Sequence, residues 1–332
     1  MHSKTSSTLQ VARHFCDSVP YSRDLGIQVM AMHDERAVMT LMPSSSLVGD
    51  VSRNFVFSSI ALSLADSCSG LAVFVATKKL LPISTLDLRM DYLRAAPAHK
   101  LLTASATCFR HTPEIAFVRC LIHSEGLEEP VAIGSSVFVR AKDGGARQDA
   151  WKAAVEKWKS PGAMSGVDSW VPVLTTSQSN TESLLEMQSS DHPCKVDDDA
   201  RCLVAQLPFA QYLGICAAVI SGIHCLKMPY RSTLIGNMTL PALHGGALGA
   251  LMEITALIAC QQMDPMRLMP KVVDSTIDYL RSGKARDTYA QAKIVRSGQR
   301  VVTLRVECWQ DDPGNVIAVM RLQLMASESS LQ

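Results

Sequence analysis

The sequence has little net charge and lacks any long uncharged apolar segment. Its 32 lysine and arginine residues nearly balance 31 aspartate and glutamate residues, which leaves a formal net charge of +1. This balance gives no indication of binding to nucleic acid or to an acidic membrane surface. The first ten residues, MHSKTSSTLQ, contain no apolar run of the kind that signal peptides carry. We therefore expect a cytoplasmic protein without a membrane span.

Several motifs that mark common enzyme classes are also missing. None of the ten cysteines forms a C-x-x-C pair, and in a chain of this length they indicate reduced, mostly buried thiols. The histidines lack metal-ligand spacing, so we expect neither a metal nor another cofactor. The phosphate-loop patterns and the G-x-S-x-G elbow are absent, which argues against nucleotide phosphate loops and serine-hydrolase chemistry.

What the sequence does contain is an internal repeat. The stretch DLRMDYLR (87–94) recurs as DSTIDYLR (274–281), with five of eight positions identical at an offset of 187 residues. The same offset aligns FSSIALSLADSCSGLAV (57–73) with HGGALGALMEITALIAC (244–260). Such agreement over a long span indicates duplication of one structural unit.

The repeat predicts two homologous domains and one fold class. We place the domains at 8–142 and 196–328, joined by a linker at 143–195 that is rich in Ser, Gly and Asp. Each repeat orders a short helix, a strand hairpin, one long apolar helix and then several runs of alternating apolar and polar residues. A helix that is apolar nearly all round belongs inside the protein. We expect an α+β fold in which each curved antiparallel sheet wraps around a long central helix.

The opening of the second apolar helix resembles a known family. The GN…HGG…E pattern of 236–253 is similar to the central-helix signature of hotdog-fold acyl-CoA thioesterases of the phenylacetic-acid-degradation class. LADSCSGLAV (64–73) resembles the helix that carries an acid in the same family, and TLDLRMDYLR resembles its next strand. The resemblance covers both repeats. It implies a tandem hotdog enzyme that hydrolyses an acyl-CoA to free acid and CoA without a metal.

Thioester hydrolysis requires groups that stabilise the negative charge on the carbonyl oxygen. It also requires a carboxylate that activates water or attacks the carbonyl. Gly245 and Gly246 begin a helix, where unpaired N–H groups and partial positive charge meet an approaching carbonyl. His244 either holds this loop or contacts the thioester. Glu253 lies nine residues beyond His244, about 13 Å along the helix, and is too distant to serve the same carbonyl. We therefore expect the acid to be Asp66, from an antiparallel helix of the other repeat.

Other candidate residues follow from the resemblance. Thr85 aligns with a position that carries a hydroxyl beside the catalytic acid, and Asn237 resembles the motif asparagine near the site. Arg94 and Arg281 follow the matched strands and are candidates to bind CoA phosphates. The structural alternatives are an ordinary strand threonine, solvated arginines at strand ends, and, for Asp66, a buried hydrogen-bonded acid without a catalytic role.

The pseudo-equivalent site in the other direction is degraded. It would combine Glu253 with Asp50, Val272 and the stretch FSS (57–59), which replaces HGG. Loss of both glycines hinders close approach of a carbonyl to the helix terminus. We expect one working site and one degenerate site, and we regard Glu253 as structural.

Two other functions and one assembly state accompany this interpretation. The degenerate first repeat leaves a non-catalytic acyl-CoA-binding or regulatory protein as the main alternative. A hotdog hydratase ranks last, because no His-Phe-Pro-Gly stretch or D-x-x-x-x-H pattern occurs. One chain already mimics a hotdog dimer, and since single-repeat relatives pair dimers into tetramers, we predict a homodimer of this chain.

Overall fold

The computed structural model describes residues 14, 16, 18–78, 82–140, 198–237, 241–263 and 268–327. The predicted linker at 143–195 lies outside these residues, as does most of the first predicted helix. The domain boundaries therefore stay a prediction.

The first repeat alternates short connections with strands around one long helix. Its described elements are α2 (Pro20–Asp24), β1 (Gln28–His33), β2 (Arg36–Leu41), β3 (Val48–Asp50), β4 (Phe55–Val56), α3 (Ser58–Thr77), β5 (Ile83–Tyr92), β6 (Leu102–His111), β7 (Ile115–Ser124) and β8 (Ala132–Arg140). A 3-10 turn, η1 (Ser45–Leu47), precedes β3.

The second repeat follows the same order. Its elements are α5 (Asp198–Ala205), α6 (Pro208–Leu213), β9 (Cys216–Ile220), β10 (Ile223–Met228), η3 (Ser232–Leu234), β11 (Ile235–Asn237), β12 (Ala242–Leu243), α7 (Gly245–Met263), β13 (Leu268–Tyr279), β14 (Thr288–Ser297), β15 (Val301–Trp309) and β16 (Ala318–Ser327).

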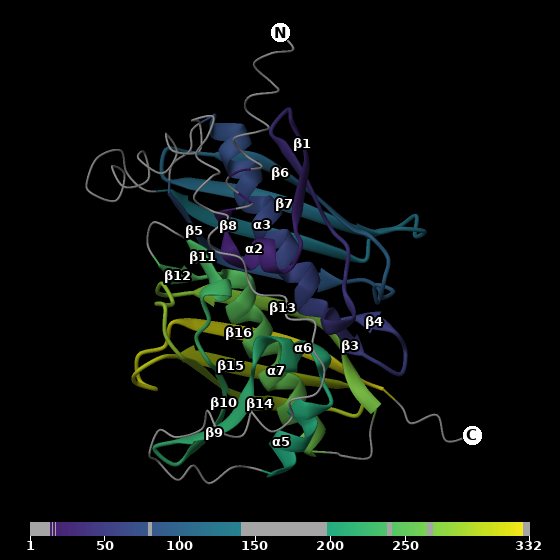
Figure 1. The fold of residues 1–332 in the computed structure, drawn as a ribbon, viewed down its shortest axis with the longest axis vertical. Helices are drawn as coiled ribbons and strands as arrows, with labels where there is room; N and C mark the ends of the chain where they lie inside the picture. Colours follow the sequence, from purple (N-terminus) through teal and green to yellow (C-terminus); the bar gives the residue numbers. More distant parts are fainter. Residues whose placement is uncertain are drawn as a thin grey trace, which may run out of the picture.

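Twelve strands form one antiparallel sheet that runs through both repeats. The order is β1-β2-β6-β7-β8-β5-β13-β16-β15-β14-β10-β9. The repeats join where β5 pairs with β13, with Leu88 opposite Ile277 and Met90 opposite Ser275. In Figure 1 the first repeat, in purple and blue, lies above the second, in green and yellow, and the strands pass behind both long helices. This arrangement confirms the predicted α+β double hotdog.

Alternating side chains give each strand one buried face. In β7, Ala116, Val118, Cys120 and Ile122 are buried, and Phe117, Arg119 and Leu121 between them are exposed. This period of two follows from the pleat of a strand, which points successive side chains to opposite faces. The buried face of the sheet packs against α3 and α7.

Helices α3 and α7 run antiparallel to each other, as the sequence predicted. A Cβ atom added to Gly246 would lie 2.8 Å from Ser63 Cα, and one on Gly249 would lie 2.9 Å from a methyl of Leu62. Further along, Ser58 reaches Glu253. Residues with increasing numbers on α7 therefore contact residues with decreasing numbers on α3, as antiparallel helices do.

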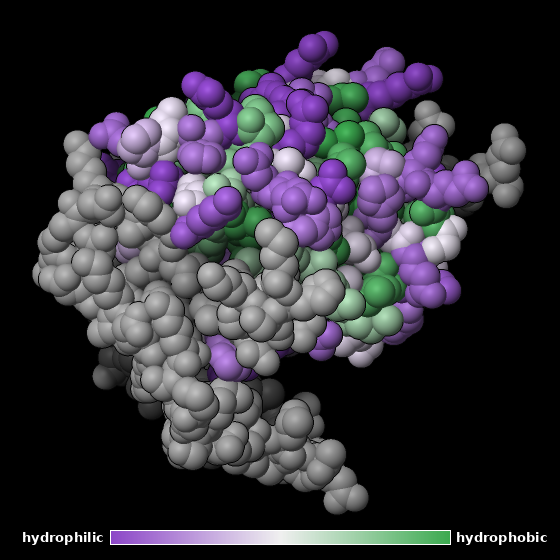
Figure 2. Space-filling view, turned by 90° about the horizontal axis from the view of Figure 1, so that it is seen from above, coloured by the Kyte–Doolittle hydropathy of each residue, from purple (hydrophilic) through white to green (hydrophobic). Residues whose placement is uncertain are grey.

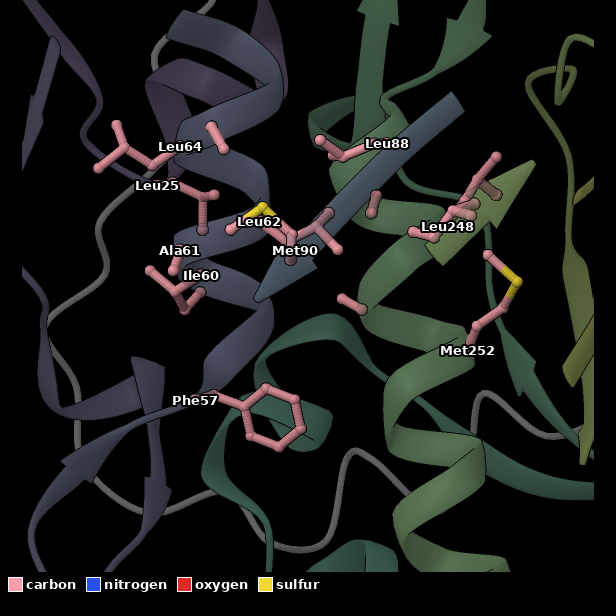
Figure 3. Close-up of a cluster of buried hydrophobic side chains, with 14 of the residues drawn as sticks. Leu25, Phe57, Ile60, Ala61, Leu62, Leu64, Leu88, Met90, Leu248 and Met252 are labelled. Carbon is pink, nitrogen blue, oxygen red and sulfur yellow. The ribbon is translucent and has the colours of Figure 1, made fainter. Parts of the chain in front are cut away.

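The apolar core fills the space between these helices and the sheet. In Figure 3, Leu62 of α3 and Met90 of β5 point into the space between the helices, and Leu248 and Met252 lie on α7. By length and composition both helices are long and apolar enough to cross a membrane, yet 78% of each such window is buried inside this fold. They are the core helices of the two repeats.

Candidate active site

A cavity of about 370 Å³ crosses the boundary between the repeats. Helix α3 and strands β5 and β8 line it from the first repeat, and β11, β12, the start of α7 and the end of β13 line it from the second. Six of the eight predicted site residues line this cavity: Asp66, Thr85, Asn237, His244, Gly245 and Arg281. The other two, Gly246 and Arg94, do not.

Asp66 is the acid of the cavity and is held by a strand hydroxyl. It lies in the middle of α3 and is 7% exposed. Thr85 on β5 donates a hydrogen bond of 2.8 Å from Oγ1 to Asp66 Oδ1. One carboxylate oxygen is thus fixed by Thr85, and the other faces the second repeat.

Gly245 brings the amino-terminal end of α7 against that carboxylate. A Cβ atom at this position would lie 2.8 Å from Asp66 Oδ2 and 3.0 Å from the Tyr279 hydroxyl oxygen. Any larger residue would push the acid away from the helix terminus. The partial positive charge of the terminus favours a carboxylate here, and its amides favour a developing oxyanion.

His244 organises this helix terminus as a neutral imidazole. Its Nδ1 accepts a hydrogen bond of 2.9 Å from the Gly246 amide, so the proton of the neutral ring is on Nε2, which lies 3.1 Å from Ser67 Oγ. Burial lowers the pKa of His244 against the opposing effect of the Asp66 charge. The 3.4 Å separation between Nδ1 and Asp66 Oδ2 is therefore not an ion pair, since the Nδ1 lone pair is already used.

Gly246 serves the packing of the two central helices and does not line the cavity. Its amide is occupied by the His244 ring, and a Cβ atom would lie 2.5 Å from Ser63 Oγ and 2.8 Å from Ser63 Cα. The glycine lets α3 and α7 approach closely. Of the two glycines, Gly245 is the one placed to meet a substrate carbonyl.

Tyr279 lines the cavity and was not among the predicted site residues. Its hydroxyl donates a hydrogen bond of 3.0 Å to the Gly245 carbonyl. Burial, with a smaller effect from the Asp66 charge, holds the pKa of Tyr279 well above its usual value. The hydroxyl thus remains a donor. The recurrence of DYLR in both repeats was the available signal for this residue.

Tyr21, also missed, covers the histidine from the first repeat. Its ring centroid lies 4.9 Å from that of His244, and its hydroxyl lies 3.3 Å from Ser63 Oγ. Tyr21 is fully buried and is not among the residues that line the cavity, so it supports the imidazole from within the core.

The second repeat adds two polar side chains to the cavity lining, Asn237 and Arg281. Asn237 ends β11, and Arg281 follows β13 and donates a hydrogen bond of 2.5 Å to the Val316 carbonyl. Arg94, the counterpart of Arg281, is placed elsewhere and forms an ion pair with Glu129. The geometry of this cavity gives no support to its predicted contact with CoA.

The pseudo-equivalent acid, Glu253, is enclosed. It is fully buried, and Ser58 donates a hydrogen bond to it from the position that Gly245 holds in the open cavity. Burial raises the pKa of Glu253 to about 7, against hydrogen bonds from Ser58 and the Ser59 backbone. Ser58 thus covers one oxygen of Glu253, whereas Gly245, at the equivalent position, has no side chain to cover Asp66.

The aromatic pair at this second location has lost its polar atoms, and the aligned acid is occupied by an arginine. The Tyr21–His244 pair is replaced by Phe209 and Phe57, whose ring centroids are 5.4 Å apart. Asp50, aligned with Asn237, is bound by Arg53. The two phenylalanine rings keep the packing of the Tyr21–His244 pair but carry no hydrogen-bonding atoms.

Val272, the counterpart of Thr85, packs against the core and carries no hydroxyl. Glu253 therefore has no strand donor equivalent to the one on Asp66. The geometry agrees with a single open site.

Comparison with known families finds that both repeats match one superfamily. The model of the thioesterase superfamily matches residues 54–131 and again residues 240–317. The medium/long-chain acyl-CoA thioesterase YigI of Escherichia coli is 24% identical over 128 residues, which cover 35% of this chain and 82% of that protein. Its namesake from Salmonella typhimurium is 24% identical over 123 residues, covering 33% and 79%.

Solved structures share the double-domain architecture over nearly the whole chain. A protein assigned as a thioesterase from Novosphingobium aromaticivorans has a TM-score of 0.58 at 15% identity and covers 90% of this chain and 98% of its own. A protein of unknown function with a hot dog fold from Alicyclobacillus acidocaldarius has a TM-score of 0.56 at 13% identity, covering 94% and 98%. At these identities the likeness establishes the fold.

Proposed function

Both repeats of this chain belong to the thioesterase superfamily, and from this premise we propose that it hydrolyses acyl-CoA to the free acid and CoA at one composite site. The observation that carries the proposal is the contact between the Asp66 carboxylate of one repeat and the Gly245 helix terminus of the other. An acid and an oxyanion donor then face the same cavity.

In the proposed reaction the thioester carbonyl lies against the Gly245 amide. Asp66 removes a proton from a water molecule, whose oxygen attacks the carbonyl carbon. The Gly245 N–H stabilises the negative charge that develops on the carbonyl oxygen. The carbon–sulfur bond then breaks, and the thiolate of CoA leaves and takes up a proton. Thr85 holds the carboxylate in position throughout.

A second route uses Asp66 as the nucleophile. Its oxygen would attack the carbonyl carbon, CoA would leave, and water would hydrolyse the resulting anhydride. The two routes are distinguished by a single turnover in ¹⁸O-labelled water. Direct attack by water labels the product acid at once, whereas the anhydride route transfers unlabelled oxygen from Asp66 in the first turnover if water attacks the aspartyl carbon.

The substrate is proposed to be an alkyl acyl-CoA. The E. coli relative is named for medium- and long-chain acyl-CoA, and the residues that line the cavity from the first repeat include the apolar side chains of Leu71, Phe74 and Phe138. Arg281 and Asn237, which line the cavity from the second repeat, suit the polar part of CoA. The acyl chain is therefore assigned to the first repeat.

A cytoplasmic location and a homodimer remain proposals. On the surface seen in Figure 2, hydrophobic side chains lie in patches among hydrophilic ones. Light scattering should give twice the chain mass of 36.1 kDa, and a mass of one chain would contradict the dimer.

The second candidate function is binding of acyl-CoA without turnover. The degenerate first repeat favours it, because FSS (57–59) stands there in place of HGG. Release of free thiol from a panel of acyl-CoAs separates the candidates, because turnover supports hydrolysis and binding alone supports the second function.

Asp66→Asn and Glu253→Gln provide the matched test of the composite site. Asp66→Asn removes the base and should lower kcat by about 10²–10⁴-fold. Glu253→Gln should keep most of the activity, because its surroundings are closed to substrate. Thermal melts of both variants check folding. An active Asp66→Asn variant together with an inactive Glu253→Gln variant would reverse the assignment.

A further inference from the structure

Gly70 lies in the wall of the cavity, and the packing around it does not require a glycine. It sits in the interior of α3, where glycine weakens a helix relative to alanine. A Cβ atom there would lie 3.5 Å from Ile83 Cδ1 and 3.8 Å from Phe138 Cε1, which are ordinary van der Waals distances. All three residues line the cavity.

The glycines of α7 differ from Gly70 in this respect. Cβ atoms at Gly246 and Gly249 would come within 3.0 Å of α3 atoms, so those glycines allow the helices to pack. The counterpart of Gly70 at the repeat offset of 187 residues is Leu257, which is 3% exposed. A large side chain is therefore accommodated at the equivalent position of the same fold.

The part of the cavity beside α3, called the channel below, is lined by Gly70 and by residues one turn away on either side. Asp66, Gly70 and Phe74 are four residues apart on one helix face, and all line the cavity. From Asp66 to Phe74 the channel advances about 12 Å along the helix axis. That length holds an extended alkyl chain of roughly eight to ten carbons, since each carbon advances somewhat less than a bond length of about 1.5 Å.

We propose that Gly70 determines acyl-chain specificity, with its missing side chain opening the cavity to an unbranched alkyl chain of medium length. The inference rests on the proposed acyl-CoA site. Leu71, Phe74 and Phe138 exclude water from the chain, and Ile83 and Phe138 face the gap that Gly70 leaves. A leucine at position 70 would occupy the channel between Asp66 and Phe74.

The test compares Gly70→Ala and Gly70→Leu with the wild-type chain on butanoyl-, decanoyl- and hexadecanoyl-CoA. In the wild-type chain kcat/KM is highest for decanoyl-CoA. Gly70→Leu lowers the ratio of kcat/KM for decanoyl-CoA to that for butanoyl-CoA by about 10-fold or more, within the range by which apolar pockets discriminate chain size. Gly70→Ala lowers this ratio by a smaller factor.

Ala259→Leu is the matched control, because it adds bulk to the other central helix at a position that does not line the cavity. Its chain-length ratio stays at the wild-type value. Gly70→Ala melts at or above the wild-type temperature, because its methyl group fits; a clearly lower melting temperature would contradict the open space. An unchanged ratio in Gly70→Leu, or a higher kcat/KM of the wild-type chain for hexadecanoyl-CoA than for decanoyl-CoA, overturns the inference.

Failure of the proposed function has a different signature. If the wild-type chain hydrolyses none of these thioesters, hydrolysis is rejected, and calorimetric titration with decanoyl-CoA and acetyl-CoA then decides the role of Gly70. A Kd ratio that changes about 10-fold in Gly70→Leu supports the channel. Equal Kd ratios in the two proteins reject it.

Discussion

Gly245 lies so close to Asp66 that a single added carbon would strike the carboxylate, at 2.8 Å from Oδ2. The two residues come from different repeats, on the facing helices α7 and α3. The acid and the helix terminus are therefore complementary halves, and neither repeat contains both parts of this cavity.

Gly245→Ala and Gly246→Ala should separate chemistry from packing. The Gly245 methyl would displace the movable Asp66 carboxyl, so we expect kcat to fall by about 10²-fold with little change in melting temperature. The Gly246 methyl would meet the Ser63 backbone at 2.8 Å, which costs about 1–3 kcal/mol of stability. Steady-state kinetics and thermal melts measure both effects. A stable, fully active Gly245→Ala variant would contradict the site geometry.

Thr85→Val copies the residue that the other repeat carries. Without the hydroxyl, Asp66 Oδ1 loses its 2.8 Å hydrogen bond, and we expect kcat to fall about 10-fold, corresponding to about 1.4 kcal/mol. Thr85→Ser restores the donor and should recover most of kcat. Equal kinetics in the valine and serine variants would show that the hydroxyl has no positioning role.

Tyr279→Phe removes the hydrogen bond to the Gly245 carbonyl. We expect a loss of about 0.5–1.5 kcal/mol of stability and a lower kcat, because the helix terminus is less well fixed. Tyr92→Phe, at the pseudo-equivalent position, is the control and should keep wild-type kcat. If both variants retain full kcat, Tyr279 contributes only to stability.

Glu253 should make stability fall as pH rises through neutrality. Its folded-state pKa is about 7 against an ordinary value of 4.5, so the folded chain keeps a proton that the unfolded chain releases. Stability is therefore lost progressively between these values, by at most about 3 kcal/mol. Glu253→Gln removes this dependence. Urea melts at pH 5 and pH 8 should show a smaller difference for the variant, and equal differences would contradict the buried protonated acid.

Much of the architecture could be predicted because the relevant signals are local. Alternating burial along 115–124 and the recurrence of DYLR depend on sequence neighbours and on a fixed offset. Asp66 and Thr85 could be paired because each aligns with a position in the other repeat and with the resembled motif. The prediction that the acid comes from the opposite helix required only the length of an α-helix.

The predictions that needed tertiary contacts were less complete. Gly246 was expected at the oxyanion position, but the turn of the helix points it at Ser63 and leaves Gly245 at the cavity. Arg94 and Arg281 align in sequence, and only Arg281 lines the open cavity. The substitution of Leu257 for Gly70 was visible in the aligned repeats, but its meaning depends on which helix face borders empty space.

The ladder between β5 and β13 has a consequence for how this protein can change over generations. In an assembly of two identical chains, every substitution appears in both chains, at positions related by the twofold axis. Here the two halves are encoded separately and are held together by their shared strands. Natural selection can therefore change one half to improve turnover and the other half to improve stability. A substitution that helps in one half is not forced on the other half, where it would do harm.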